Sequence, residues 1–292
     1  MDDRSSAAGT TWTAAGTEHA ARTALVDAQS SGFDPWVAYF EANTARQQRL
    51  ERDWDRSAPV ALSDRQRRGL VRSFQRLELG EGGDGVRLLS KARAAGDPVY
   101  TRALELLVSE EQKHSALFGV GLRRMGAPSL RRHWSDSAFT RLRRLLGLRT
   151  EIALFMIAEA VSVEYFEALA DHAPDPILRG IGERIRTDER EHLRFQVDGL
   201  RAGFADASDL TRAAVGVAWW VVAVGAATVL CVDHAEALRA CGRRPLGYWG
   251  RALRRFRSVA RSALWSGHSR EPSEPDDRPH LLGPEVAIDA AS

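Results

Sequence analysis

The sequence predicts an all-α protein: a four-helix bundle built from a duplicated helical hairpin, with extra helices at its N-terminal and C-terminal ends. Two Glu-x-x-His motifs, at 111–114 and 189–192, lie 78 residues apart in helical patterns. Further pairs obey the same shift: Glu81 and Glu159, Asp97-Pro98 and Asp175-Pro176, Gly121-Leu122 and Gly199-Leu200. Apolar residues at helical spacing fill the stretches between the helix breakers. Such a repeat indicates one structural unit used twice.

The first residues are expected to lie outside the folded domain. Residues 1–30 are rich in Ala, Ser, Thr and Gly, a composition typical of disorder. Residues 31–265 are predicted to form the helical domain, with the bundle core at about 63–204. A helix opening at 33–36 (Phe-Asp-Pro-Trp) is expected to pack outside the bundle, its aromatic side chains serving packing.

The first bundle helix is predicted to begin at Ser63-Asp64, which are good capping residues. Glu81 interrupts its apolar face, so its carboxylate should point inward, and Glu78 is the rival on nearly the same face. We favour Glu81 because only Glu81 obeys the 78-residue shift. The glycines around it, at 80, 82, 83 and 85, each cost about 1 kcal/mol in a helix. They indicate space for a substrate or dioxygen, an irregular helix, or close helix packing.

The boundaries of the remaining predicted bundle helices are likewise marked by capping residues, glycines and prolines. A second helix at about 98–125 ends at Gly126-Ala127-Pro128, and a connector containing His133 crosses the bundle. The third helix, at about 144–173, places Glu159 within an apolar run, whereas its rival Glu164 fails the repeat. Tyr165 is assigned to packing in preference to a redox role. The fourth helix runs from Pro176 to about 204.

The C-terminal third adds a fifth helix, at about 211–240, and a basic helical stretch at 251–261. Residues 213–232 contain no charged side chain, which by length alone qualifies them to span a membrane. We favour a helix packed on the bundle, because Trp219-Trp220 would lie in mid-membrane. Asp233 and His234 are candidates for additional ligands or for hydrogen-bonding support of ligands. Residues 266–292 are predicted to be a disordered tail.

The repeated residues are suited to binding two metal ions. Positions i and i+3 share a helix face, so each Glu-x-x-His can present both side chains to one ion. Carboxylates and imidazoles hold iron or manganese, and four carboxylates balance two divalent ions. Unpaired, the same acids would be costly to bury. The predicted ligands are Glu81, Glu111, His114, Glu159, Glu189 and His192.

This six-residue pattern, over about residues 65–203, resembles the ferritin-like superfamily of di-iron carboxylate proteins. The group includes bacterioferritin, rubrerythrin, acyl-carrier-protein desaturases and di-iron amine N-oxygenases. The resemblance implies a four-helix bundle in which two helices each supply Glu and two supply Glu-x-x-His. Arylamine N-oxygenases add a His where this chain has Ile185, so the chain resembles that branch less.

The resemblance further implies a non-haem di-iron oxidoreductase. Two Fe ions, or a Mn/Fe pair, would activate dioxygen as co-substrate for hydroxylation, desaturation or heteroatom oxidation. The expected partners are a small-molecule or carrier-bound substrate and an external electron donor, and a homodimer is compatible with the sequence. The alternative is a ferroxidase, iron-storage or peroxide-scavenging protein. A rubrerythrin-type site needs four cysteines, and the chain has only Cys231 and Cys241.

Composition limits the remaining classes. A net charge of +2, with the basic residues spread over several helices, does not indicate a nucleic-acid partner. The N-terminus has no basic segment followed by an apolar one, so no secretory signal is predicted. Two distant cysteines give no disulfide framework. A cytoplasmic location is therefore expected, with membrane contact through 213–232 as the less favoured alternative.

Overall fold

The computed structural model describes residues 32–52, 54, 57, 59–60, 62–130 and 147–265, and all regular secondary structure in this part of the chain is helical. The predicted tails, 1–30 and 266–292, and the connector residue His133 lie outside the described residues. The helices are α2 (Asp34–Arg52), α3 (Asp64–Glu81), α4 (Val86–Ala95), α5 (Pro98–Arg124), α7 (Leu148–His172), α8 (Pro176–Gly203), α9 (Asp209–Asp233), α10 (Ala235–Ala240) and α11 (Pro245–Trp265).

Local sequence explains where the central helices begin. Ser63 forms a capping box with Gln66 at the start of α3. Asp97 caps α5 and Asp175 caps α8, each followed by a proline at the first helical position. The two aspartates are equivalent in the 78-residue repeat, so α5 and α8 begin in the same way and carry their Glu-x-x-His motifs at the same depth.

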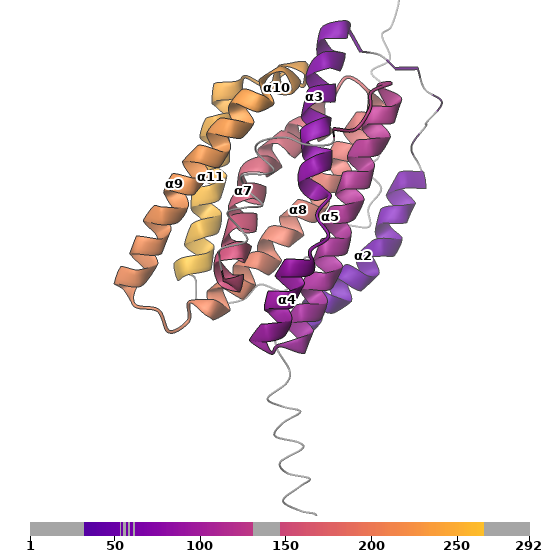
Figure 1. Cartoon of the computed structure of the whole chain (residues 1–292). Helices are drawn as coiled ribbons and strands as arrows, with labels where there is room; N and C mark the ends of the chain where they lie inside the picture. Colours follow the sequence, from indigo (N-terminus) through magenta and orange to yellow (C-terminus); the bar gives the residue numbers. More distant parts are fainter. Residues whose placement is uncertain are drawn as a thin grey trace, which may run out of the picture.

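The predicted ligands lie on four helices, α3, α5, α7 and α8. α3 packs against α5, α7 against α8, and α5 against α8, while α4 packs on α5 and α7 (Figure 1). α2 covers α5 and α8 from outside, as expected for an added helix. At the interface of α7 and α8, Gly182 lies so close that a Cβ would stand 2.6 Å from the backbone nitrogen of Ala170.

The helix predicted to be the first of the bundle is interrupted immediately after Glu81. α3 ends there, and α4 begins at Val86 after a left-handed Gly85 with φ of +65°. The glycines predicted to mark space, an irregularity or close packing therefore mark a break in the helix. A Cβ on Gly85 would also lie 2.6 Å from the Val108 side chain of α5, so glycine lets the chain turn against that helix.

The apolar segment 213–232 packs on the rest of the protein along one face only, so it is less buried than a helix packed into the core would be. It lies within α9, which packs on α7 and α11 at the edge of the molecule opposite α2 (Figure 1). Only 22% of its most apolar 18-residue window is buried, so the helix is not enclosed as a core helix would be. The predicted fifth helix also ends earlier than expected, at Asp233, and the short α10 follows His234.

Candidate metal centre

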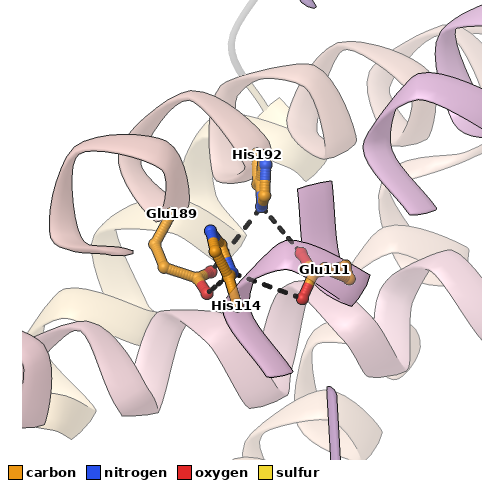
Figure 2. A group of neighbouring side chains, drawn as sticks. All are labelled: Glu111, His114, Glu189 and His192. Atoms are coloured by element: carbon orange, nitrogen blue, oxygen red, sulfur yellow. Dashed lines mark ion pairs between the residues drawn. The ribbon is translucent and has the colours of Figure 1, made fainter. Parts of the chain in front are cut away.

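Two neighbouring helices bring both Glu-x-x-His motifs together. Glu111 and His114 project from α5, and Glu189 and His192 project from α8 (Figure 2). One ligand atom from each of the four lies within 4.8 Å of the others. Both imidazoles are fully buried, as is Glu189. These four residues form a buried carboxylate and histidine cluster that can hold metal.

The imidazoles face the carboxylates through their Nδ1 atoms. His192 Nδ1 lies 2.8 Å from Glu111 Oε1 and 3.9 Å from Glu189 Oε2. His114 Nδ1 lies 3.5 Å from Glu189 Oε1 and 3.7 Å from Glu111 Oε2. Each carboxylate therefore lies between the two imidazoles and is near both.

The opposite nitrogen of each ring is held by a carboxylate from the other helix. His114 Nε2 lies 2.8 Å from Asp188 Oδ2, and His192 Nε2 lies 2.9 Å from Glu110 Oε2. A proton on Nε2 satisfies these carboxylates and leaves Nδ1 with its lone pair toward the cluster, the arrangement that metal-binding histidines adopt. Glu110 and Asp188 were not predicted as site residues. They obey the 78-residue shift and directly precede Glu111 and Glu189, and this signal could have identified them.

A third helix supports this pair of carboxylates. Asn43 Nδ2 of α2 donates to Glu110 Oε1 at 2.7 Å and to Asp188 Oδ1 at 2.9 Å. Gln47, one turn later, donates to the Glu110 oxygen at 3.0 Å. The buried guanidinium of Arg184 pairs with Asp188. α2 is therefore part of the site. Its two amides are four residues apart on one face, but nothing in the local sequence indicates which helix that face contacts.

Glu81 and Glu159 lie beside the four-residue group. Burial raises the pKa of Glu81, and the charge of Glu111 raises it further. Burial also raises the pKa of Glu159, with Glu189 and Glu111 adding to the effect. Glu159 Oε1 accepts from Gln196 Nε2 at 2.6 Å, while its Oε2 is buried without a partner. The electrostatic coupling is what two further ligands would show, and their role as ligands stays a prediction.

The rival glutamates have other partners. Glu78 accepts from Ser129 Oγ at 2.8 Å and lies against Gly119 of α5, and it is not one of the four clustered residues. Glu164 is held by Arg251 at 3.0 Å and by Arg255 of α11.

The additional candidates also lie outside the cluster. His234 Nδ1 is 2.7 Å from Ser73 Oγ, which donates to the hydroxyl of Tyr165 at 2.6 Å. Asp233 lies beside Arg76. His234, between α9 and α10, therefore belongs to a buried network with Tyr165 of α7 and Ser73 of α3, and neither His234 nor Asp233 is one of the four clustered residues.

Unpartnered atoms test whether the cluster fits metal ions. His114 Nδ1, His192 Nδ1, Glu111 Oε1 and Glu189 Oε2 are all buried without a hydrogen-bond partner. Buried polar atoms normally have partners, and leaving one unsatisfied costs about 1–3 kcal/mol. Here the unsatisfied atoms are the very atoms that converge on one another. Two imidazole nitrogens with carboxylate oxygens match the donor set of iron and manganese, so the residues fit.

The electrostatics of the protein without metal agree with this fit. Burial disfavours a charged imidazole, but Glu111 and Glu189 raise the pKa of His114 to about 10. Burial also opposes charge on His192, whose pKa is nevertheless raised well above its usual value by Glu111 and Glu110. Burial opposes ionisation of Glu111 too, but the two imidazoles hold its pKa well below the usual range. Protons thus occupy the positions that metal ions would take, and metal binding would release them.

A cavity of about 340 Å³ reaches this cluster from the break between α3 and α4. Glu81 and Glu111 line it together with glycines at 80, 83 and 85. Its apolar walls are Leu88, Leu107, Val108 and Phe155, and its charged residues outside the cluster are Asp84, Arg87, Lys91 and Glu151. Lys91 and Glu151 pair with each other. The cavity therefore joins the candidate metal ligands to solvent through a passage with both apolar and charged walls.

Comparison with known proteins identifies no relative: no family model, no curated protein and no solved structure matches the chain.

Proposed function

We propose that this chain is a non-haem di-iron oxidoreductase on a ferritin-like four-helix bundle, which uses dioxygen to oxidise a small organic or carrier-bound substrate. The observation that carries the proposal is the reciprocal arrangement of the histidines. Each Nε2 is held by a carboxylate of the opposite helix, and each Nδ1 forms no hydrogen bond but faces the carboxylates of Glu111 and Glu189. The pairing of α3 with α5, α7 with α8 and α5 with α8 supports the bundle.

The roles of the ligands follow from their positions. His114 and His192 would each cap one ion, because their Nδ1 atoms face the carboxylates and form no hydrogen bond. Glu111 and Glu189 would serve both ions, since each lies near both imidazoles. Glu81 and Glu159 would each serve one ion. A bound pair of iron ions supplies the electrons and open coordination positions that dioxygen chemistry needs.

The surrounding residues would orient the histidines and enclose the substrate. Glu110 and Asp188 fix the tautomer and the ring angle of the histidines, and Asn43 holds both of these carboxylates at once. The cavity admits dioxygen and a small organic molecule beside Glu81 and Glu111, and its volume lies at the small end of ligand sites. The apolar walls would exclude water from the oxidised atom. An external donor would return the ions to the reduced state.

The direct test is the metal content and dioxygen uptake of the chain. Protein stripped with a chelator and loaded with Fe(II) without oxygen should contain two irons per chain by elemental analysis, and it should consume dioxygen. Slow turnover that accelerates with an organic substrate supports an oxygenase. Fast iron oxidation without any substrate, with large protein shells on a sizing column, would instead indicate iron handling.

Substitution of one histidine locates the chemistry. His192→Ala should bind about half the iron and lose the reaction with dioxygen while its helices persist, because Glu110 and Glu111 lose the imidazole between them. Glu81→Gln and Glu78→Gln form a matched pair on α3, of which only Glu81→Gln should impair iron binding. Full iron content and activity in His192→Ala would refute the assignment.

A further inference from the structure

α9 and α11 form an exposed apolar surface at a distance from the candidate metal centre. Large apolar side chains are exposed there: of the eleven with high exposure among the described residues, seven lie on α9 and two on α11. Those on α9 are Leu210, Val217, Trp220, Val221, Val222, Val229 and Val232. Soluble monomers rarely expose a contiguous apolar patch of this kind, and one rimmed by polar residues marks an interaction site.

The patch follows one face of α9. Val217 and Val221 are four residues apart and are 67% and 66% exposed, and Leu210 and Val232 continue the same face at 82% and 68%. The opposite face is buried through Trp219, Ala223, Ala227 and Cys231. α9 thus presents an uncharged apolar stripe along its full length while its other side is fixed to the protein.

A basic stripe lies on the helix beside it. α11 packs along α9, where Trp249 Nε1 donates to Thr228 Oγ1 at 3.1 Å and Trp265 lies against Gly216. Arg254, Arg257 and Arg261 follow one another at helical spacing on α11 and are exposed. Within the described part of the chain, none of these three forms an ion pair, whereas Arg251 and Arg255 of the same helix are bound to Glu164.

We propose that this surface docks on an anionic lipid bilayer, with α9 lying along the headgroup region and the arginines of α11 contacting lipid phosphates. An apolar helix face flanked by arginine and tryptophan is the usual composition of an interfacial helix. The cytoplasmic leaflet carries anionic lipid, which attracts such basic residues. The proposal does not depend on the metal centre, since the exposed residues of α9 and α11 contact none of the clustered ligands.

Two other arrangements fit the observations less well. α9 does not cross the bilayer alone, because it is packed along α7 and α11, and the ion pairs of Glu164 with Arg251 and Arg255 between those helices would then enter hydrocarbon. A second copy docked by two-fold symmetry would cover the apolar stripe of α9, but a self-complementary apolar contact gives no role to Arg254, Arg257 and Arg261.

The experiment is co-sedimentation of the full chain with vesicles of phosphatidylcholine alone or mixed with phosphatidylglycerol. The chain should bind the mixed vesicles, and binding should weaken with added salt. The paired substitution Val217→Glu with Val221→Glu, and the triple substitution of Arg254, Arg257 and Arg261 to Gln, should each weaken partitioning on the order of 100-fold. Circular dichroism of the variants checks that their helices persist.

Matched controls are Val60→Glu for the apolar stripe and Arg52, Arg65 and Arg68 to Gln for the basic stripe, all exposed on other segments. These should bind the vesicles like the native chain. The proposal is overturned if the native chain fails to bind anionic vesicles, or if the arginine variant binds as well as its control. It is also overturned if the chain is a dimer that Val217→Glu with Val221→Glu dissociates while vesicles bind neither form.

Discussion

At the scale of single residues, the site is organised as two equivalent halves. Glu110 of α5 holds the histidine of α8, and Asp188 of α8 holds the histidine of α5, so each helix orients the ligand of the other. Asn43 joins the two carboxylates through one amide group. Displacement of one imidazole would therefore disturb the ligand on the opposite helix as well.

Substitution of Asp188 tests this support. Asp188→Asn removes the charge that balances His114 and Arg184, while the side chain keeps a similar size. We expect metal affinity to fall about 10–100-fold, the usual effect of losing a carboxylate behind a metal-binding histidine. A Co(II) titration followed by absorbance measures it. Asp171→Asn, at a carboxylate of α7 that pairs with Arg186 near the surface, is the control, and equal affinity in both variants would contradict the role of Asp188.

The candidate metal ligands could be predicted from the sequence more readily than the residues that hold them in place. The clustering of the four Glu-x-x-His residues could be predicted because the repeat places them at fixed spacing on two helices. Glu110 and Asp188 carried the same signal and were not assigned, because an acidic residue beside a ligand resembles a solvated one. Asn43, Gln47 and Arg184 could not be predicted at all, since their role depends on which helix faces α2, a long-range contact that no local pattern encodes.

At the scale of helices, capping residues predicted the start of α3, and the repeated Asp-Pro pairs mark the starts of α5 and α8. A break after Glu81 was only one of three interpretations of the glycines. Four weak helix formers in a row lower the stability of a helix, but they do not determine which structure forms in its place. The burial of α9 could not be predicted from the sequence. Its composition suits both a core helix and an exposed one, and only the placement of α7 and α11 decides that most of its face is uncovered.

The break between α3 and α4 is expected to control access to the metal centre. Gly83 lines the cavity, and a Cβ there would meet no atom within 4 Å, so a larger side chain can be accommodated without backbone strain. Gly83→Trp should fill the cavity and slow dioxygen consumption with an organic substrate, while two irons remain bound. Gly147→Trp, equally open but outside the cavity, should react normally. Unchanged turnover in Gly83→Trp would mean that the substrate enters elsewhere.

The close contact of α7 and α8 is expected to depend on Gly182. A Cβ at this position would lie 2.6 Å from the backbone nitrogen of Ala170 and 2.9 Å from Leu169, so the two helices must separate to admit it. Gly182→Ala should destabilise the fold by about 1–3 kcal/mol, as overpacking does, and urea unfolding measures this. Gly80→Ala, where the new methyl group meets nothing within 4 Å, should not destabilise the protein; equal losses would show that helix spacing is not limited by Gly182.

At the scale of the whole molecule, the candidate metal centre lies among α3, α5, α7 and α8, with α2 behind it, so it joins segments far apart in sequence. Glu111 and Glu189 are buried beside each other, and Glu159 is buried near both. Without metal, this arrangement keeps protons on groups that would otherwise repel and leaves polar atoms unsatisfied in the interior. Metal binding should therefore stabilise the entire fold and not only the ligands.

The size of this stabilisation follows from the linkage between metal binding and unfolding. Metal at 100 times its dissociation constant adds about 2.7 kcal/mol to the free energy of unfolding, if the unfolded chain does not bind it. For a domain of this size that corresponds to a rise in Tm of about 5–10 °C. Thermal unfolding under anaerobic Fe(II), or under Mn(II) in air, should show the rise, and a chelator should reverse it. The double variant His114→Ala with His192→Ala should unfold at one temperature with or without metal, because no imidazole remains to hold either ion; a rise equal to that of the native chain would place the metal elsewhere.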